Sequence, residues 1–127
     1  MKAHRPTCLC VDYNNFAYIG YDDGTISRID ILSYKVTHEF RIGKFINFID
    51  VSKNNKHILI SYINEEKEQM VSLIDNKLNI VQNYEQSDRE SPARVFCGFN
   101  LTAKKIFICW TYRKYSKIQV FIMSDNE

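Results

Sequence analysis

Residues 20–30, Gly-Tyr-Asp-Asp-Gly-Thr-Ile-Ser-Arg-Ile-Asp, carry the clearest structural signal in the chain. Asp23 and Gly24 form a dipeptide that is typical of a tight turn between two strands, because glycine readily adopts the positive φ that such turns require. The flanking residues 16–21 and 25–31 are rich in Ile, Tyr and Phe, which β-structure favours. The stretch therefore predicts a β-hairpin.

Similar strand-like runs continue along the whole chain, separated by turn residues. No stretch of 12 residues has a convincing helical period, so the sequence predicts an all-β protein. The expected strands cover residues 7–11, 16–21, 25–31 and 35–40, then 45–51, 57–63, 69–75 and 79–84, and finally 93–99, 105–111 and 117–123.

These strands belong to an internal repeat. Residues 50–61 align with residues 98–109 without a gap, at an offset of 48, and residues 16–20 take the same place 41 residues before residues 57–61. Repeats of about 40–45 residues with four strands each are typical of the blades of a β-propeller. An antiparallel sandwich or barrel with similar turns is the alternative.

The quoted stretch resembles the signature of the WD-repeat β-propeller family. In that pattern a small residue and Gly end the second strand, an Asp-Gly turn and a Thr follow, and the third strand ends in Trp-Asp. Here Ile29 stands in the Trp position and Asp30 keeps the Asp position. Residues 50–61 and 98–109 resemble the first turn of a blade in the same family.

The resemblance also implies a hydrogen-bonded tetrad of His, Asp, Ser or Thr, and Trp. Asp23 is present, His4 is the candidate histidine, Tyr21 replaces the Ser and Ile29 replaces the Trp. The family members are interaction scaffolds, so the resemblance implies a non-catalytic role.

The expected architecture is one domain, residues 1–127, made of antiparallel four-stranded blades of a partial β-propeller. The blade-like units cover about 4–43, 44–86 and 93–127, and the last is incomplete because it lacks an outer strand. Closed propellers usually have four to eight blades. We therefore expect a fragment or a split propeller that completes itself with missing blades, with a partner protein, or with a second copy in a six-bladed ring.

Composition narrows the function classes. The chain has 127 residues and a net charge of +2, which is too weak a bias to indicate nucleic-acid or membrane binding by itself. The N-terminus lacks the apolar segment of a secretory signal, and no apolar run approaches membrane-spanning length. A cytoplasmic or nuclear location is expected.

The four cysteines, at positions 8, 10, 97 and 109, are expected to be buried, reduced thiols. A zinc site would join His4, Cys8, Cys10 and one distant cysteine. Structural zinc sites usually place paired cysteines two to four residues apart in a turn, whereas Cys8 and Cys10 alternate along a strand. No catalytic triad, nucleophile elbow, phosphate loop or calcium loop is present either, so neither an enzyme, a cofactor, a metal nor a small-molecule substrate is expected.

Two segments are candidate binding sites. In residues 110–117 basic and aromatic residues alternate, as in surfaces that stack bases and hold phosphates; the candidate residues are Trp110, Tyr112, Arg113, Lys114 and Lys117. An exposed Trp110 would be a natural anchor for a protein contact. A solvated hairpin tip is the alternative.

The other segment, residues 38–43, loosely resembles the Phe-Arg-Arg-Gly motif of phosphoinositide-binding propellers, with Arg41 present and Ile42 in place of the second arginine. A connecting strand is the alternative. The sequence thus favours a protein–protein interaction scaffold whose partners are other protein chains. Phosphate binding, to a membrane lipid or to RNA through Arg41 or the segment 110–117, is the competing hypothesis.

Overall fold

A computed structural model describes residues 4–86 and 88–123 and contains three antiparallel sheets over these ranges. The first sheet has the order β1 (Pro6–Val11), β2 (Phe16–Tyr21), β3 (Thr25–Asp30), β4 (Lys35–Arg41). The second has the order β5 (Phe45–Val51), β6 (His57–Ile63), β7 (Gln69–Asp75), β8 (Ile80–Tyr84). The third has the order β9 (Arg94–Phe99), β10 (Lys105–Thr111), β11 (Ser116–Ile122).

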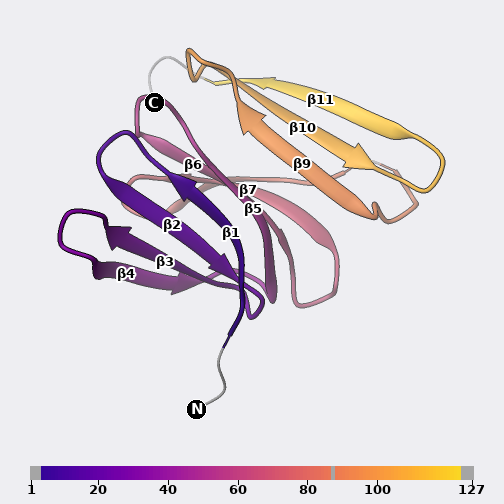
Figure 1. Ribbon diagram of the computed structural model, residues 1–127. Coiled ribbons are helices and arrows are strands. Elements are labelled where there is room, and N and C mark those ends of the chain that lie inside the picture. The colour runs from indigo at the N-terminus through magenta and orange to yellow at the C-terminus, as the bar shows by residue number, and fades with distance from the viewer. Residues whose placement is uncertain (1–3, 87, 124–127) are drawn as a thin grey trace.

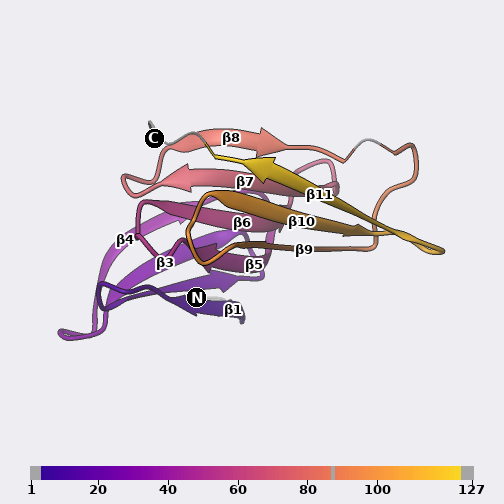
Figure 2. The same cartoon turned by 90° about the horizontal axis from the view of Figure 1, so that it is seen from above.

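The sheets are stacked side by side in chain order, as blades of a β-propeller. Figure 1 shows the second sheet between the first, in indigo and purple, and the third, in orange and yellow. Strands β1 and β2 contact β5, and β5 and β6 contact β9, so each sheet meets the next mainly through its first strands. Figure 2 shows the same arrangement from above. The predicted partial propeller is confirmed, and the alternative of a single sandwich or barrel is wrong.

The middle sheet is buried on both faces because it has a neighbour on each side. Every residue of β6 from His57 to Tyr62 is buried. In β10, by contrast, Ile106, Ile108 and Trp110 are buried while the alternate residue Phe107 is exposed. Since side chains alternate across a strand, this pattern places one face of the third sheet against the second sheet and leaves the other face uncovered.

Two separate apolar cores join the sheets. The core between the first and second sheets contains Tyr18, Ile26, Ile42, Ile46, Ile49, Val51, Ile58, Ile60, Tyr62 and Ile74. The core between the second and third sheets contains Leu59, Val71, Leu73, Tyr84, Val95, Ile106, Ile108, Trp110 and Tyr112. Burial of these apolar side chains stabilises the stacked sheets by about 25 cal/mol per Å² of apolar surface removed from water.

Asn and Asp side chains organise the turns between strands. Asn64 Oδ1 accepts hydrogen bonds from the backbone N–H groups of Glu66 and Glu68, and the residue three after Asn64, Lys67, has a φ of +65°. The turn after Asp75 repeats the arrangement, and in the turn after Asn100 the Asn100 Oδ1 accepts instead from the backbone N–H groups four and five residues later. Such short polar side chains mimic a backbone turn and so stop each strand at a defined residue.

Lys67 offers a test of these turns. Because a left-handed conformation is unfavourable for a residue with a Cβ, Lys67→Gly should raise the free energy of unfolding by about 0.5 kcal/mol. Urea unfolding followed by the fluorescence of Trp110, the only tryptophan, measures the change. Glu66→Gly is the control, since Glu66 has no positive φ to relieve, and should lower stability; equal effects of the two changes would contradict the assignment.

The predicted strands agree closely with the observed ones. Five predicted ranges have the observed bounds: 16–21, 45–51, 57–63, 69–75 and 105–111. The others differ by one residue at one or both ends. No helix occurs in residues 4–86 and 88–123, and hence none there that is long and apolar enough to cross a membrane.

Candidate functional site

The outer face of the third sheet is apolar and exposed. Its side chains come from all three strands, as the register shows: Phe107 lies opposite Val120, and Cys109 lies opposite both Ile118 and Phe96. The large apolar residues of this face are between 41% and 80% exposed; they are Phe96, Phe107, Ile118, Val120 and Ile122. We call the face formed by Phe96, Phe107, Ile118, Val120 and Ile122 the third-sheet outer face.

The opposite end of the stack has a similar surface. Leu9 lies opposite Ile19, and Val36 lies opposite Ile29, on the face of the first sheet that points away from the second sheet. Leu9, Val11 and Val36 are exposed, while the two isoleucines are half-buried. We call the face formed by Leu9, Val11, Ile19, Ile29 and Val36 the first-sheet outer face.

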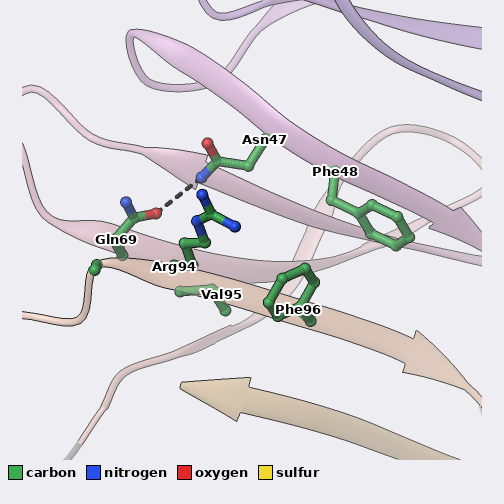
Figure 3. A pocket seen from close by; sticks show the side chains of 7 residues that line it. Asn47, Phe48, Gln69, Arg94, Val95 and Phe96 are labelled. Atoms are coloured by element: carbon green, nitrogen blue, oxygen red, sulfur yellow. Dashed lines mark hydrogen bonds between the residues drawn. The ribbon is translucent and has the colours of Figure 1, made fainter. Parts of the chain in front are cut away.

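A pocket of about 240 Å³ opens between the innermost strands of the second and third sheets, and Figure 3 shows its lining. Asn47 Nδ2 donates a hydrogen bond of 2.8 Å to Gln69 Oε1. The guanidinium of Arg94 lies beside this amide pair, and the rings of Phe48 and Phe96 lie together at the other end (Figure 3). The pocket thus combines a cation, two amides and two aromatic rings.

The structure corrects the expectation of an exposed Trp110. The Trp110 side chain is completely buried in the core between the second and third sheets, and Tyr112 is 3% exposed. Trp110 Nε1 donates a 2.6 Å hydrogen bond to Gln119 Oε1. Because the face of β10 that carries Ile106, Ile108 and Trp110 points inward, Trp110 is a core residue and not a surface anchor.

Three other residues of the segment 110–117, namely Tyr112, Tyr115 and Lys117, contact the loop before β9. Lys117 Nζ lies 2.5 Å from Asp88 Oδ1, and the Tyr115 hydroxyl donates to the same carboxylate. The hydrogen bond with Asp88, more than desolvation, raises the pKa of Tyr115 to about 12. Tyr112 stacks on Tyr115 at 4.7 Å between ring centroids and donates to Gln86 Oε1. These contacts give the segment a structural role in the hairpin tip.

The other cationic residues predicted to bind phosphate do not form one cluster. Arg113 and Lys114 are exposed, and their side chains have no partner within the described ranges. Arg41 is exposed at the end of β4, where its Nε donates a 3.0 Å hydrogen bond to the backbone carbonyl of Asp23. The structure does not bring Arg41 together with Arg113, Lys114 or Lys117, and phosphate binding through them stays a prediction.

The predicted turn residues form a local network in the first sheet. Asp23 accepts hydrogen bonds from the Thr25 backbone N–H and from the Thr25 hydroxyl, at 3.0 and 2.9 Å. His4 Nε2 lies 3.3 Å from Asp23 Oδ2. Desolvation would raise the pKa of the Asp23 carboxyl, but the hydrogen bonds from Thr25 and the nearby His4 together hold it below its usual range. Asp30 Oδ1 accepts from the backbone N–H of Leu32 and so shapes the next turn.

Two of the four expected tetrad residues therefore lie together, His4 and Asp23. Tyr21 and Ile29, which stand in the Ser and Trp positions, are half-buried, and no hydrogen bond within the described ranges joins the side chain of either to that pair.

A possible metal-binding group occurs at the same place, formed by His4, Asp22 and Asp23, and sequence analysis did not single it out. Their ligand atoms lie within 4.8 Å of one another. Exposed acidic groups of this kind are common without a metal, so the group by itself indicates no site. None of the cysteines joins it: Cys8 and Cys10 pack against the first core, and desolvation together with nearby Asp50 raises the pKa of Cys97 to about 12.

The pocket residues also escaped sequence analysis. Asn47 and Gln69 lie 22 positions apart in sequence, and no motif links them to Arg94. Asn47 is also placed by the irregular register of β5 with β6 between Ile46 and Phe48, which no pattern of residue types predicts.

No known protein family and no curated protein sequence matches this chain. Its structure is similar to that of Kuenenia stuttgartiensis hydrazine synthase, with a TM-score of 0.74 and 15% identity over 93% of this chain and 32% of that chain. It is also similar to the β-propeller domain of Myceliophteria thermophila Cps50 (Swd1), with a TM-score of 0.66 and 14% identity over 95% of this chain and 40% of that one. The WD40 repeats of RRP9 match with a TM-score of 0.65 and 10% identity, over 98% of this chain and 41% of theirs.

This chain thus spans between about a third and two fifths of the length of these three chains. At identities of 10–15% the likeness shows the β-propeller fold alone. One of the three is an enzyme, one is a β-propeller domain and one consists of WD40 repeats. The shared fold therefore does not distinguish a catalytic from a non-catalytic role.

Proposed function

We propose that this chain is a non-catalytic interaction scaffold of WD-repeat type, in which three propeller sheets join further sheets of the same kind. The observation that carries the proposal is the exposure of apolar residues on both outer faces of the stack. Soluble monomers rarely leave contiguous apolar faces uncovered, and such faces usually mark sites of association.

The two outer faces have the composition of the buried interfaces between the sheets. The third-sheet outer face carries Phe, Ile and Val, as the second core does, and the first-sheet outer face carries Leu, Ile and Val. A sheet packed on either face would continue the stacking that already joins the three sheets. The contact of Asp23 with Thr25 and His4 supports the WD-repeat assignment of the first sheet.

A second copy of the chain is the proposed occupant. Three sheets from each of two copies make six, which lies within the four to eight blades of closed propellers. In this ring the third-sheet outer face of each copy packs on the first-sheet outer face of the other, so one two-fold axis buries all four faces. The stacking of the sheets within one copy supports the same arrangement between copies.

Light scattering after size-exclusion chromatography tests the proposal. The expected species is a dimer, with twice the 15.0 kDa mass of one chain. Ile118→Lys should weaken the dimer about 100-fold or more, since it buries a charge without a partner on the third-sheet outer face.

Leu32→Lys is the matched control. Leu32 is 76% exposed in the turn between β3 and β4, outside the strands that form the two outer faces, so the dimer should persist. A folded monomer at all concentrations would overturn self-association, and a dimer equally weakened by both changes would overturn the assignment of the interface. Association only with a different propeller chain would overturn the proposed occupant.

A further inference from the structure

We propose that the pocket between β5 and β9 binds a carboxylate that stands next to an aromatic ring, as an acidic side chain or the C-terminus of a peptide supplies. This site lies between β5 and β9 and shares only Phe96 with the third-sheet outer face. It takes a small ligand and not a further sheet, so the inference goes beyond the proposed function. It rests on the side chains that Figure 3 shows and on the strands that hold them.

Arg94 supplies the cation. It is exposed at the start of β9, and its guanidinium has no hydrogen bond or ion pair with any residue in the ranges 4–86 and 88–123. A guanidinium is a planar fork of N–H donors that matches the two oxygens of a carboxylate. An arginine that lines a pocket and has no acidic partner is therefore suited to an anion from outside.

The amide pair adds donors beside the guanidinium. Because Asn47 Nδ2 donates to Gln69 Oε1, the amide N–H groups of Gln69 remain for a ligand oxygen. Asn47 reaches this position through an irregularity of the β5–β6 register, which pairs Ile46 with Tyr62 and Phe48 with Ser61 and leaves Asn47 between them. A bulge of this kind turns a side chain toward a place that regular pairing would not reach.

Two rings form the other end of the pocket. Phe48 on β5 is 39% exposed, Phe96 on β9 is 54% exposed, and their rings lie on the same side of the pocket (Figure 3). Aromatic rings on one side of a pocket favour a flat apolar group over a second charge. A ligand that spans the pocket thus needs an anionic end at Arg94 and an aromatic end at Phe48 and Phe96.

The volume of the pocket and the charges near it limit the class of ligand further. A volume of about 240 Å³ is below the usual range for drug-sized ligands and suits about one or two side chains. The adjacent pocket, which shares Gln69, is lined by Glu68 and Glu85. These carboxylates disfavour a doubly charged phosphate more than a singly charged carboxylate, because repulsion grows with the charge of the ligand.

An NMR titration of the ¹⁵N-labelled chain tests the proposal, with N-acetyl-L-phenylalanine as the probe. The side-chain signals of Asn47, Gln69 and Arg94 should shift with a dissociation constant on the order of millimolar, as expected of so small a ligand. N-acetyl-L-phenylalaninamide keeps the ring and lacks the charge, so its dissociation constant should be higher by roughly tenfold or more. N-acetyl-aspartyl-phenylalaninamide separates an acidic side chain from a C-terminal carboxylate as the source, and binding of either supports the site.

Variants locate the binding. Arg94→Gln should weaken binding of N-acetyl-L-phenylalanine roughly tenfold or more, while Arg113→Gln, at another exposed arginine, should leave it unchanged. Unchanged binding by Arg94→Gln, equal binding of the uncharged amide, or tighter binding of phenyl phosphate than of N-acetyl-L-phenylalanine would overturn the proposal. Because a monomer leaves the whole pocket accessible, Phe96 included, failure of self-association would not produce any of these results.

Discussion

Replacing Gly24 with alanine should lower the free energy of unfolding by about 2–4 kcal/mol. Gly24 has a φ of +87°, and a Cβ built on it would lie 2.2 Å from the carbonyl oxygen of Gly43. That neighbour is backbone, so no side-chain rotation relieves the contact. The Gly24 carbonyl also accepts a 2.8 Å hydrogen bond from the Ile42 N–H, which joins the turn to the segment leading into the second sheet.

Gly98→Ala is the matched control for this change. A Cβ at Gly98 would meet only Asp50 Oδ2, at 3.4 Å, and Gly98 has no positive φ. Its stability should stay within about 0.5 kcal/mol of the unchanged protein or rise slightly, since alanine is better than glycine in a strand. Urea unfolding at one fixed protein concentration measures both variants, and an equal loss in the two would contradict the role assigned to the turn.

Trp110→Ala should cost about 3–5 kcal/mol, a large part of the stability of a small domain. The indole is fully buried between Leu59, Val71 and the other residues of the second core. Its removal leaves a cavity and leaves Gln119 without its hydrogen-bond donor. Circular dichroism during urea unfolding is the measurement, since the variant has no tryptophan.

Two further substitutions separate the causes of that loss. Trp110→Phe keeps a ring in the core but not the hydrogen bond to Gln119, and should cost less than Trp110→Ala. Tyr115→Ala, at an exposed aromatic residue of the neighbouring hairpin tip, should cost about 1 kcal/mol or less. If Trp110→Ala unfolded no more easily than Tyr115→Ala, Trp110 would not be the core residue described above.

Much of the fold could be predicted because the signals for it are local. The Asp23-Gly24 turn, and the Asn64 and Asp75 turns, end strands through hydrogen bonds between residues two to four positions apart. The runs of Ile, Val, Tyr and Phe between them form strands wherever they pack. Strand bounds were therefore predicted to within one residue at each end.

The candidate sites were predicted less well. Residues 110–117 have an alternation of basic and aromatic types that is typical of a binding surface, yet Trp110 and Tyr112 face the core. Lys117 contacts Asp88, 29 residues earlier in the chain. The pocket joins Asn47, Gln69 and Arg94 from three strands of two sheets, and nothing in the spacing of these residues links them.

The amino-acid sequence by itself determines that this chain forms three antiparallel β-units, because turn chemistry and β-favouring residues act over a few neighbouring positions. Which face of each strand is buried was decided only by the tertiary structure. Strand β10 is apolar on both faces, with Ile106 and Trp110 on one and Phe107 on the other, so its sequence does not distinguish them. Stacking against the second sheet covers the first pair and leaves Phe107 exposed, and the same stacking creates the pocket beside β9.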